Sequence, residues 1–257
     1  MKRKFSESFS ETDTMEQAYF ESFQNEYFLK TEQNRIAVLN QLKEQTVDLY
    51  RESIKEYDVH RFKANRLHFS GQKISFNLTN GFKKFIREEN VYFLRRNSNA
   101  MLNLLKSLPG FLSFGHNDLK TIMNQHFFSI MTLRTLKLYL NDEFYFMLDD
   151  TIQINKELFA FLYDKKSRNY TFHMFSSIRS LNLTEKEIGL MIPFFLSSIY
   201  KNLENKELMK EVYGYYSNAL FDEFKKNKRS VEFMKKFTYI ACMGPKVNNA
   251  LMDVSLM

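Results

Sequence analysis

The sequence holds few residues that break helices: its 257 residues include 7 Gly, 3 Pro and no Trp, against 27 Phe, 14 Tyr and 13 Met. Glycine and proline are the residues least compatible with a helix interior, so their scarcity leaves long stretches without a breaker. Hydrophobic residues make up 44% of the chain, which is enough to close a sizeable core in one large domain or two small ones. We therefore expect an almost wholly helical protein.

Cysteine is nearly absent as well. The single Cys242 excludes an intramolecular disulfide. It also excludes a zinc module, because structural zinc usually takes four Cys or His ligands at close spacing. We therefore expect no metal or other cofactor and no zinc-finger DNA-binding domain in this chain. A reducing compartment, the nucleus or the cytoplasm, is the expected location.

Long hydrophobic runs are also missing. No apolar stretch reaches the roughly 18 to 20 residues that a membrane-spanning helix needs. The nearest, residues 188–200, is interrupted by a glycine, a proline and two serines, and the N-terminus is too polar for a secretory signal. We expect no association with membranes.

The positive charge is spread out rather than concentrated. A net charge of +7 and a pI near 9.2 would suit a nucleic-acid partner, but the lysines and arginines are distributed along the chain. Solvated helix faces explain that distribution better than a binding patch does, and we expect no direct DNA binding.

Apolar spacing at intervals of three and four residues predicts most of the secondary structure. Residues 1–14 are polar and are expected to form a disordered tail. One or two helices should fill residues 15–58. Further long helices are expected over residues 82–107, from 116 or 117 to about 140, 206–226 and 230–242. Gly244 and Pro245 should end the last of these and leave a separate short element over residues 250–257.

Two local patterns are more specific. Residues 144–148 are predicted to form a strand, with a turn at 149–151 and a return strand at 152–154. Asn155 should then cap a short helix over Lys156–Tyr163. Thr184 and Glu187 have the spacing of a capping box, which predicts a helix start at that point.

The stretch from Leu104 to Met123, LLKSLPGFLSFGHNDLKTIM, is expected to form two helices joined by a Pro-Gly elbow. It resembles the signature of nuclear receptor ligand-binding domains: aromatic-Ala-Lys, four residues, Phe, two residues, an aliphatic, three residues, Asp-Gln, two residues and two aliphatics. The matching positions are Lys106, Phe111 and Asp118. Phe114, Ile122 and Met123 replace the apolar residues of the signature with other apolar residues. The sequence departs from the signature at Leu104, Leu105 and Leu119.

The order of the expected elements agrees with this signature, and the Phe-rich composition is most similar to the expanded nuclear receptor set of nematodes. The resemblance implies an all-α fold, a three-layer helical sandwich with one small hairpin. That domain would occupy residues 15–257, with its core from about Arg35. It also implies a nuclear, transcription-regulating protein that is not an enzyme.

The resemblance further implies a groove for a coregulator helix bearing an LxxLL motif. In the family a Lys and a Glu hold the two ends of that helix, because its last carbonyls and first amides lack partners. Lys106 matches the Lys position, and Asp253 stands near the Glu position. The residues expected at the groove are Leu102, Lys106, Leu119, Lys120, Met123 and Asp253.

A pocket for a small lipophilic ligand is implied as well. Carrying the family register over from Lys106 gives the expected lining Asn90, Val91, Leu94, Asn97, Phe128, Met131, Thr132, Thr135, Leu138 and Met147. The alternative is that aromatic side chains fill this interior and leave a ligand-free domain. Leu138 favours the alternative, because many family members keep an arginine at that position for the polar end of a ligand.

A second function remains open, that of a helical interaction module that modulates another receptor without binding DNA. In the family, homo- or heterodimers form through the penultimate long helix. The residues that match this dimer face are Phe233, Phe237 and Ile240.

Catalysis has less support in the sequence. Paired carboxylates at Asp142-Glu143 and at 149–150 are similar to magnesium sites of isoprenoid synthases, but such sites need another carboxylate about one turn later. Gln153 occupies that place. The five histidines show no metal-binding spacing.

Overall fold

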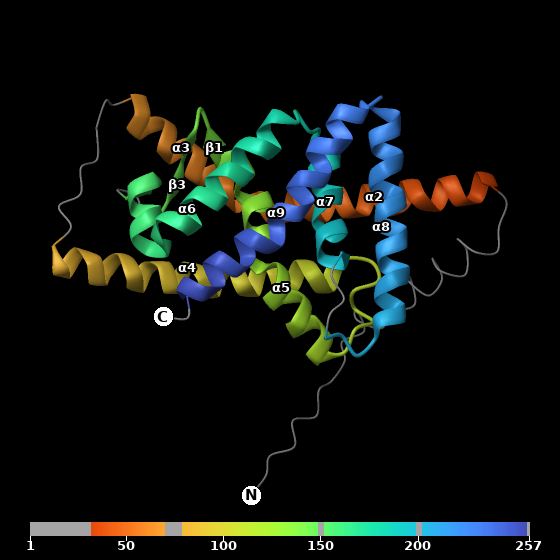
Figure 1. Ribbon diagram of the computed structural model, residues 1–257, viewed down its shortest axis with the longest axis horizontal. Coiled ribbons are helices and arrows are strands. Elements are labelled where there is room, and N and C mark those ends of the chain that lie inside the picture. Colours follow the sequence, from red (N-terminus) through yellow and green to blue (C-terminus); the bar gives the residue numbers. More distant parts are fainter. Residues whose placement is uncertain (1–31, 70–78, 149–151, 199–201, 256–257) are drawn as a thin grey trace, which may run out of the picture.

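The computed structural model describes residues 32–69, 79–148, 152–198 and 202–255 (Figure 1). These residues form the expected all-α fold with a small β component. The helices are α2 (Glu32–Ile54), α3 (Glu56–Phe69), α4 (Asn80–Ser107), α5 (His116–Thr135), α6 (Lys156–Ser180), α7 (Glu185–Ser197), α8 (Lys206–Lys226) and α9 (Val231–Ser255). The expected tail, residues 1–14, lies outside the described residues.

Helix α5 is the centre of the packing. It contacts α2 and α4 as well as α6, α7 and α9, which agrees with a layered helical sandwich. In Figure 1, α4 runs along one side of the molecule and α9 crosses diagonally toward it. No helix among the described residues is long and apolar enough to cross a membrane.

The helix before the elbow has nearly the expected bounds. The side chain of Thr79 accepts a hydrogen bond from the Phe82 amide at 3.3 Å, which caps the start of α4. The helix ends at Ser107, and Gly110 has a φ of 90° in the turn that follows. Glycine adopts that left-handed conformation without steric cost, so the Pro-Gly elbow forms as predicted.

Helix α5 ends earlier than predicted, at Thr135 instead of about residue 140. A single 3-10 turn, η1 (Leu136–Leu138), follows it and leads into a strand. Leu136, Leu138 and Tyr139 are all buried, so the apolar pattern of this segment reflects packing in the core rather than a longer helix.

Among the described residues the predicted hairpin forms as a shorter strand pair, and a second short antiparallel pair, which was not predicted, precedes it. Strand β1 (Tyr139–Leu140) pairs with β2 (Glu143–Phe144), and β3 (Phe146–Met147) pairs with β4 (Gln153–Ile154). Between β1 and β2 stand Asn141 and Asp142, with φ values of 51° and 62°. Two such residues form the tight turn that asparagine and aspartate favour. The predicted turn at 149–151 lies outside the described residues.

The two capping predictions are confirmed. Asn155 caps α6 through the Leu158 amide at 2.9 Å. The first part of α6 ends at Tyr163, because Asp164 has non-helical φ and ψ angles of 75° and 168°. Thr184 and Glu187 form the predicted reciprocal capping box at the start of α7.

The prediction that Gly244 and Pro245 end a helix is wrong, since α9 runs through both residues to Ser255. No separate terminal helix therefore forms in the described part of the chain. Tertiary contacts outweigh the local cost of proline: α9 packs along α5 and α6, and Asn248 is buried against α5.

Candidate helix-docking groove and interior cavity

A hollow of about 750 Å³ opens on the surface between α4 and α5. Residues one turn apart on each helix form its walls, and α9 adds one methionine near its end. The lining residues are Val91, Leu94, Arg95, Ser98, Asn99, Leu102, Lys106, His116, Leu119, Lys120, Met123, Asn124, Phe127, Phe128 and Met252. We refer to this hollow as the groove.

Five of the six residues expected at a coregulator groove line this one hollow: Leu102, Lys106, Leu119, Lys120 and Met123. The sixth, Asp253, follows the lining residue Met252 and is exposed. The resemblance implies Leu102 and Lys106 but not Arg95, which lies about two helical turns before Leu102 on the same side of α4 and also lines the groove.

Two signature residues, Asp118 and Phe111, fix the position of α5 and of the elbow beside the groove. Asp118 is buried and accepts hydrogen bonds from the amides of Glu204 and Asn205 at 2.6 and 3.0 Å, which ties α5 to the start of α8. Phe111 is fully buried in the elbow, and the Tyr216 hydroxyl donates to the Pro109 carbonyl at 2.9 Å. The elbow is therefore fixed to α8.

Asn248 fixes the last turns of α9 beside the groove. Its amide accepts a hydrogen bond from the Phe128 N–H at 2.9 Å and donates to the Asn124 carbonyl at 2.8 Å. In a regular helix the Phe128 N–H would donate to the Asn124 carbonyl, four residues earlier. The Asn248 amide bonds to both of these groups. The Ser167 hydroxyl also donates to the Ala250 carbonyl at 3.0 Å. Met252 is thereby held at the groove from both sides.

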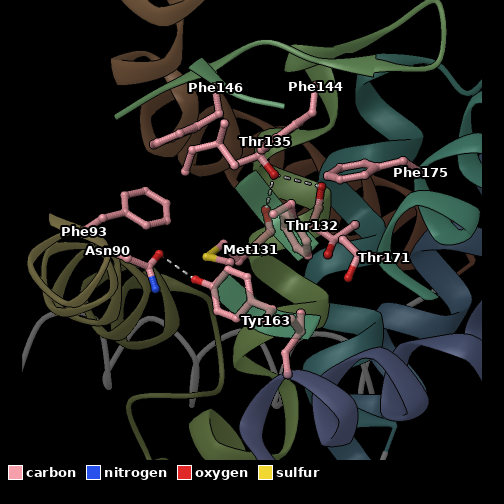
Figure 2. Close-up of a pocket in the computed structure, with 13 residues that line it drawn as sticks. Asn90, Phe93, Met131, Thr132, Thr135, Phe144, Phe146, Tyr163, Thr171 and Phe175 are labelled. Carbon is pink, nitrogen blue, oxygen red and sulfur yellow. Dashed lines mark hydrogen bonds between the residues drawn. The ribbon is translucent and has the colours of Figure 1, made fainter. Parts of the chain in front are cut away.

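A separate cavity lies in the interior, and it is almost filled. Its volume is about 20 Å³, close to the space of one water molecule and far below the roughly 300 Å³ of small ligand sites. Figure 2 shows aromatic side chains around it. The lining residues are Asn90, Phe93, Met131, Thr132, Thr135, Phe144, Phe146, Ile154, Phe159, Tyr163, Thr171, Phe175 and Leu251.

Four residues expected at a ligand pocket line this cavity: Asn90, Met131, Thr132 and Thr135. The other six lie elsewhere. Val91, 46% exposed, and Leu94 were expected to face inward, but they line the surface groove, as does Phe128. Asn97, Leu138 and Met147 are buried outside the cavity lining. The positions that the resemblance assigned to the pocket are therefore mostly right on α5, where Met131, Thr132 and Thr135 line the cavity. They are mostly wrong on α4, where only Asn90 does.

The polar side chains of the cavity already have partners within the protein. Tyr163 donates its hydroxyl proton to Asn90 at 2.7 Å, and burial raises the pKa of this tyrosine (Figure 2). Thr132 and Thr135 donate to carbonyls of their own helix, each at 2.8 Å. None of these three hydroxyl protons is left to bind a ligand.

Arg134 is a buried charge that sequence reasoning missed. Its guanidinium donates to Asn97 at 3.1 Å, to the Ser53 carbonyl at 2.7 Å and to Glu56 at 3.1 Å. The same Asn97 oxygen accepts the hydroxyl proton of Tyr57 at 2.7 Å. Asn97, expected to anchor a ligand, instead joins α3, α4 and α5 in a hydrogen-bonded network.

The residues expected at a dimer face are buried inside the chain. Phe233, Phe237 and Ile240 are 8%, 2% and 1% exposed. The rings of Phe233 and Phe237 pack against Phe224 of α8, with centroids 4.9 and 5.0 Å away. The apolar stripe of α9 therefore packs in the core of the chain, and the expectation of an exposed dimer face at these residues is wrong.

The candidate carboxylates do not form a metal site in the described residues, where no three metal-ligating side chains come together. Asp142 pairs with Lys156 and accepts the Tyr139 hydroxyl proton. The hydrogen bond from Lys156 lowers the pKa of Asp142. The second expected pair, at 149–150, lies outside the described residues.

Comparison with known families and with curated proteins adds no relative, because no family model and no curated protein matches this sequence.

Proposed function

We propose that this chain is a regulatory domain built like a nuclear receptor ligand-binding domain, which recruits coregulator helices of LxxLL type and works without a small-molecule ligand. The observation that carries the proposal is the groove, where Leu102, Lys106, Leu119, Lys120 and Met123 meet in one hollow. A nuclear location and a role in transcription belong to this proposal.

The groove suits an amphipathic helix of two to three turns. Leu102, Leu119 and Met123 offer apolar surface for the leucines, which a helix presents at intervals of three and four residues. Lys106 is exposed and stands at the end of α4. There its ammonium group can donate to the unpaired carbonyls at the C-terminal end of the bound helix.

The interior supports the ligand-free form of this function rather than the lipophilic ligand that the resemblance implies. A cavity of about 20 Å³ has no room for a lipid-sized molecule. The packed interior would hold α5 and α9 in position without a ligand, since Asn248 already joins them. The alternative dimerisation module has less support, because its expected face is buried.

Peptide binding tests the proposal. A fluorescent LxxLL peptide should bind the purified protein, and Lys106→Ala should weaken binding ~5- to 30-fold, the equivalent of about 1–2 kcal/mol. Lys84→Ala is the matched control, because Lys84 is an exposed lysine of the same helix outside the groove. Equal affinity in the wild type and the Lys106 variant would refute the proposed role of the groove.

Native mass spectrometry tests the ligand-free part separately. The purified protein should have its bare mass, and lipophilic compounds should not raise its melting temperature. A bound lipid-sized molecule would show that the interior opens in solution. That result would refute the ligand-free form of the proposal and favour a ligand-dependent receptor.

A further inference from the structure

The charged side chains that line the groove are all positive. Arg95, Lys106 and Lys120 line it, and no carboxylate does among its described lining residues. Asp253, next to Met252 at the border, is the nearest acidic residue in sequence to the lining of α9. The charged side chains that a partner meets on the groove lining are therefore positive.

Two of these cations stand far apart along α4. Arg95 and Lys106 are separated by 11 positions, which corresponds to about 16 Å along a helix at 1.5 Å per residue. An LxxLL core covers only the middle of this distance, so about one further turn at each end of a bound helix would lie near a cation.

Arg95 is free to take part in binding. It is exposed, and the described part of the chain provides it with no ion pair or hydrogen bond. The neighbouring Arg96 differs, since it points to α3 and pairs with Glu56 at 2.8 Å. The charge of Arg95 is therefore directed into the groove without an internal counter-charge.

We infer that the groove selects acidic helices, namely partner helices with carboxylates in the turn that precedes the first leucine. This inference rests on the proposed function, which places the C-terminal end of the partner helix at Lys106. The N-terminal turn then lies toward Arg95. A bare helix N-terminus carries partial positive charge and would be repelled there, whereas Asp or Glu in that turn neutralises it and pairs with Arg95.

The test uses three peptides with one LxxLL core and a first turn that is acidic, neutral or basic. The wild-type protein should bind the acidic peptide roughly three- to tenfold more tightly than the neutral one, and the basic peptide most weakly. High salt should reduce these differences, because the pairs are exposed. Arg95→Glu should reverse the order of the acidic and basic peptides.

Lys84→Glu is the matched control. It makes the same change of charge on the same helix outside the groove, so it should keep the wild-type order of the peptides. Equal affinities for the three peptides, or an unchanged order in Arg95→Glu, would overturn the acidic selectivity while the groove still binds a helix. Failure of all three peptides to bind would instead overturn the proposed function itself.

Discussion

Substitution of Phe175 tests whether side chains of the protein fill the interior. This residue of α6 is 1% exposed, lines the interior cavity and packs against Tyr139 and Phe144, with ring centroids 5.0 and 5.2 Å away. Phe175→Ala removes the ring and leaves a space beside an existing gap of about 20 Å³. Substitutions of this kind cost about 3–5 kcal/mol. For a domain of this size the melting temperature should fall by roughly 6–20 °C.

The enlarged cavity should then accept a small apolar molecule. Benzene or a similar aromatic compound, added at about 100 times its dissociation constant, would restore about 2.7 kcal/mol. Differential scanning fluorimetry with and without the compound measures both effects. The wild-type melting temperature should not respond to the compound.

Phe62→Ala is the matched control, because Phe62 on α3 is 66% exposed. It should change stability by no more than about 0.5 kcal/mol and create no binding site. The filled interior would be refuted if the compound stabilised the wild-type protein, or if Phe175→Ala cost less than about 1 kcal/mol.

Two further predictions concern buried ionisable groups. Burial opposes ionisation of Glu187, but hydrogen bonds from Arg229 and Asn227 hold its pKa below the ordinary value. Its stabilising effect should be complete above the unfolded pKa near 4.5 and should disappear as pH falls through the folded pKa. Urea unfolding from pH 7 to 3 should show a smaller acid loss in Glu187→Gln than in the wild type, and equal losses would contradict this role. Burial lowers the pKa of His126 to about 4, so the protein should lose stability as pH falls from about 6.5 to 4. Its ring resonances in NMR should not titrate between pH 7 and 5, and a midpoint above 6 would contradict the burial.

Much of the fold follows from local sequence. The scarcity of glycine and proline predicts the all-α class, and the Thr184–Glu187 capping box marks the start of α7. The bounds predicted for α8, 206–226, are those observed. These features are local, because caps and helical spacing act within one or two turns of the chain.

The predictions that are wrong concern features that depend on packing between segments far apart in the sequence. Pro245 does not end α9, because α5 and α6 hold that helix on both sides of it. Phe233 and Phe237 have the spacing of an exposed dimer stripe, but one apolar face cannot show whether α8 of the same chain or a partner covers it. The Asn141-Asp142 turn was a local signal that could have predicted the additional strand pair.

Five lining residues of the candidate groove were expected from the sequence, whereas the volume of the interior cavity was left open. Helical spacing brings Leu102 and Lys106 to one face of α4, and the elbow brings α5 beside it. The volume of the cavity depends instead on how rings from separate elements pack, among them Phe93 of α4, Phe146 of β3 and Phe175 of α6. No spacing rule gives that volume.

Methyl NMR of methionine tests the central claim, that a coregulator helix binds this groove, most directly. Met123 and Met252 line the groove, whereas Met131 lines the interior cavity and Met209 is buried in α8. Titration with an LxxLL peptide should shift the Met123 and Met252 signals and leave Met131 and Met209 in place, with weaker binding in Lys106→Ala. Unchanged Met123 and Met252 signals at saturating peptide would contradict the account.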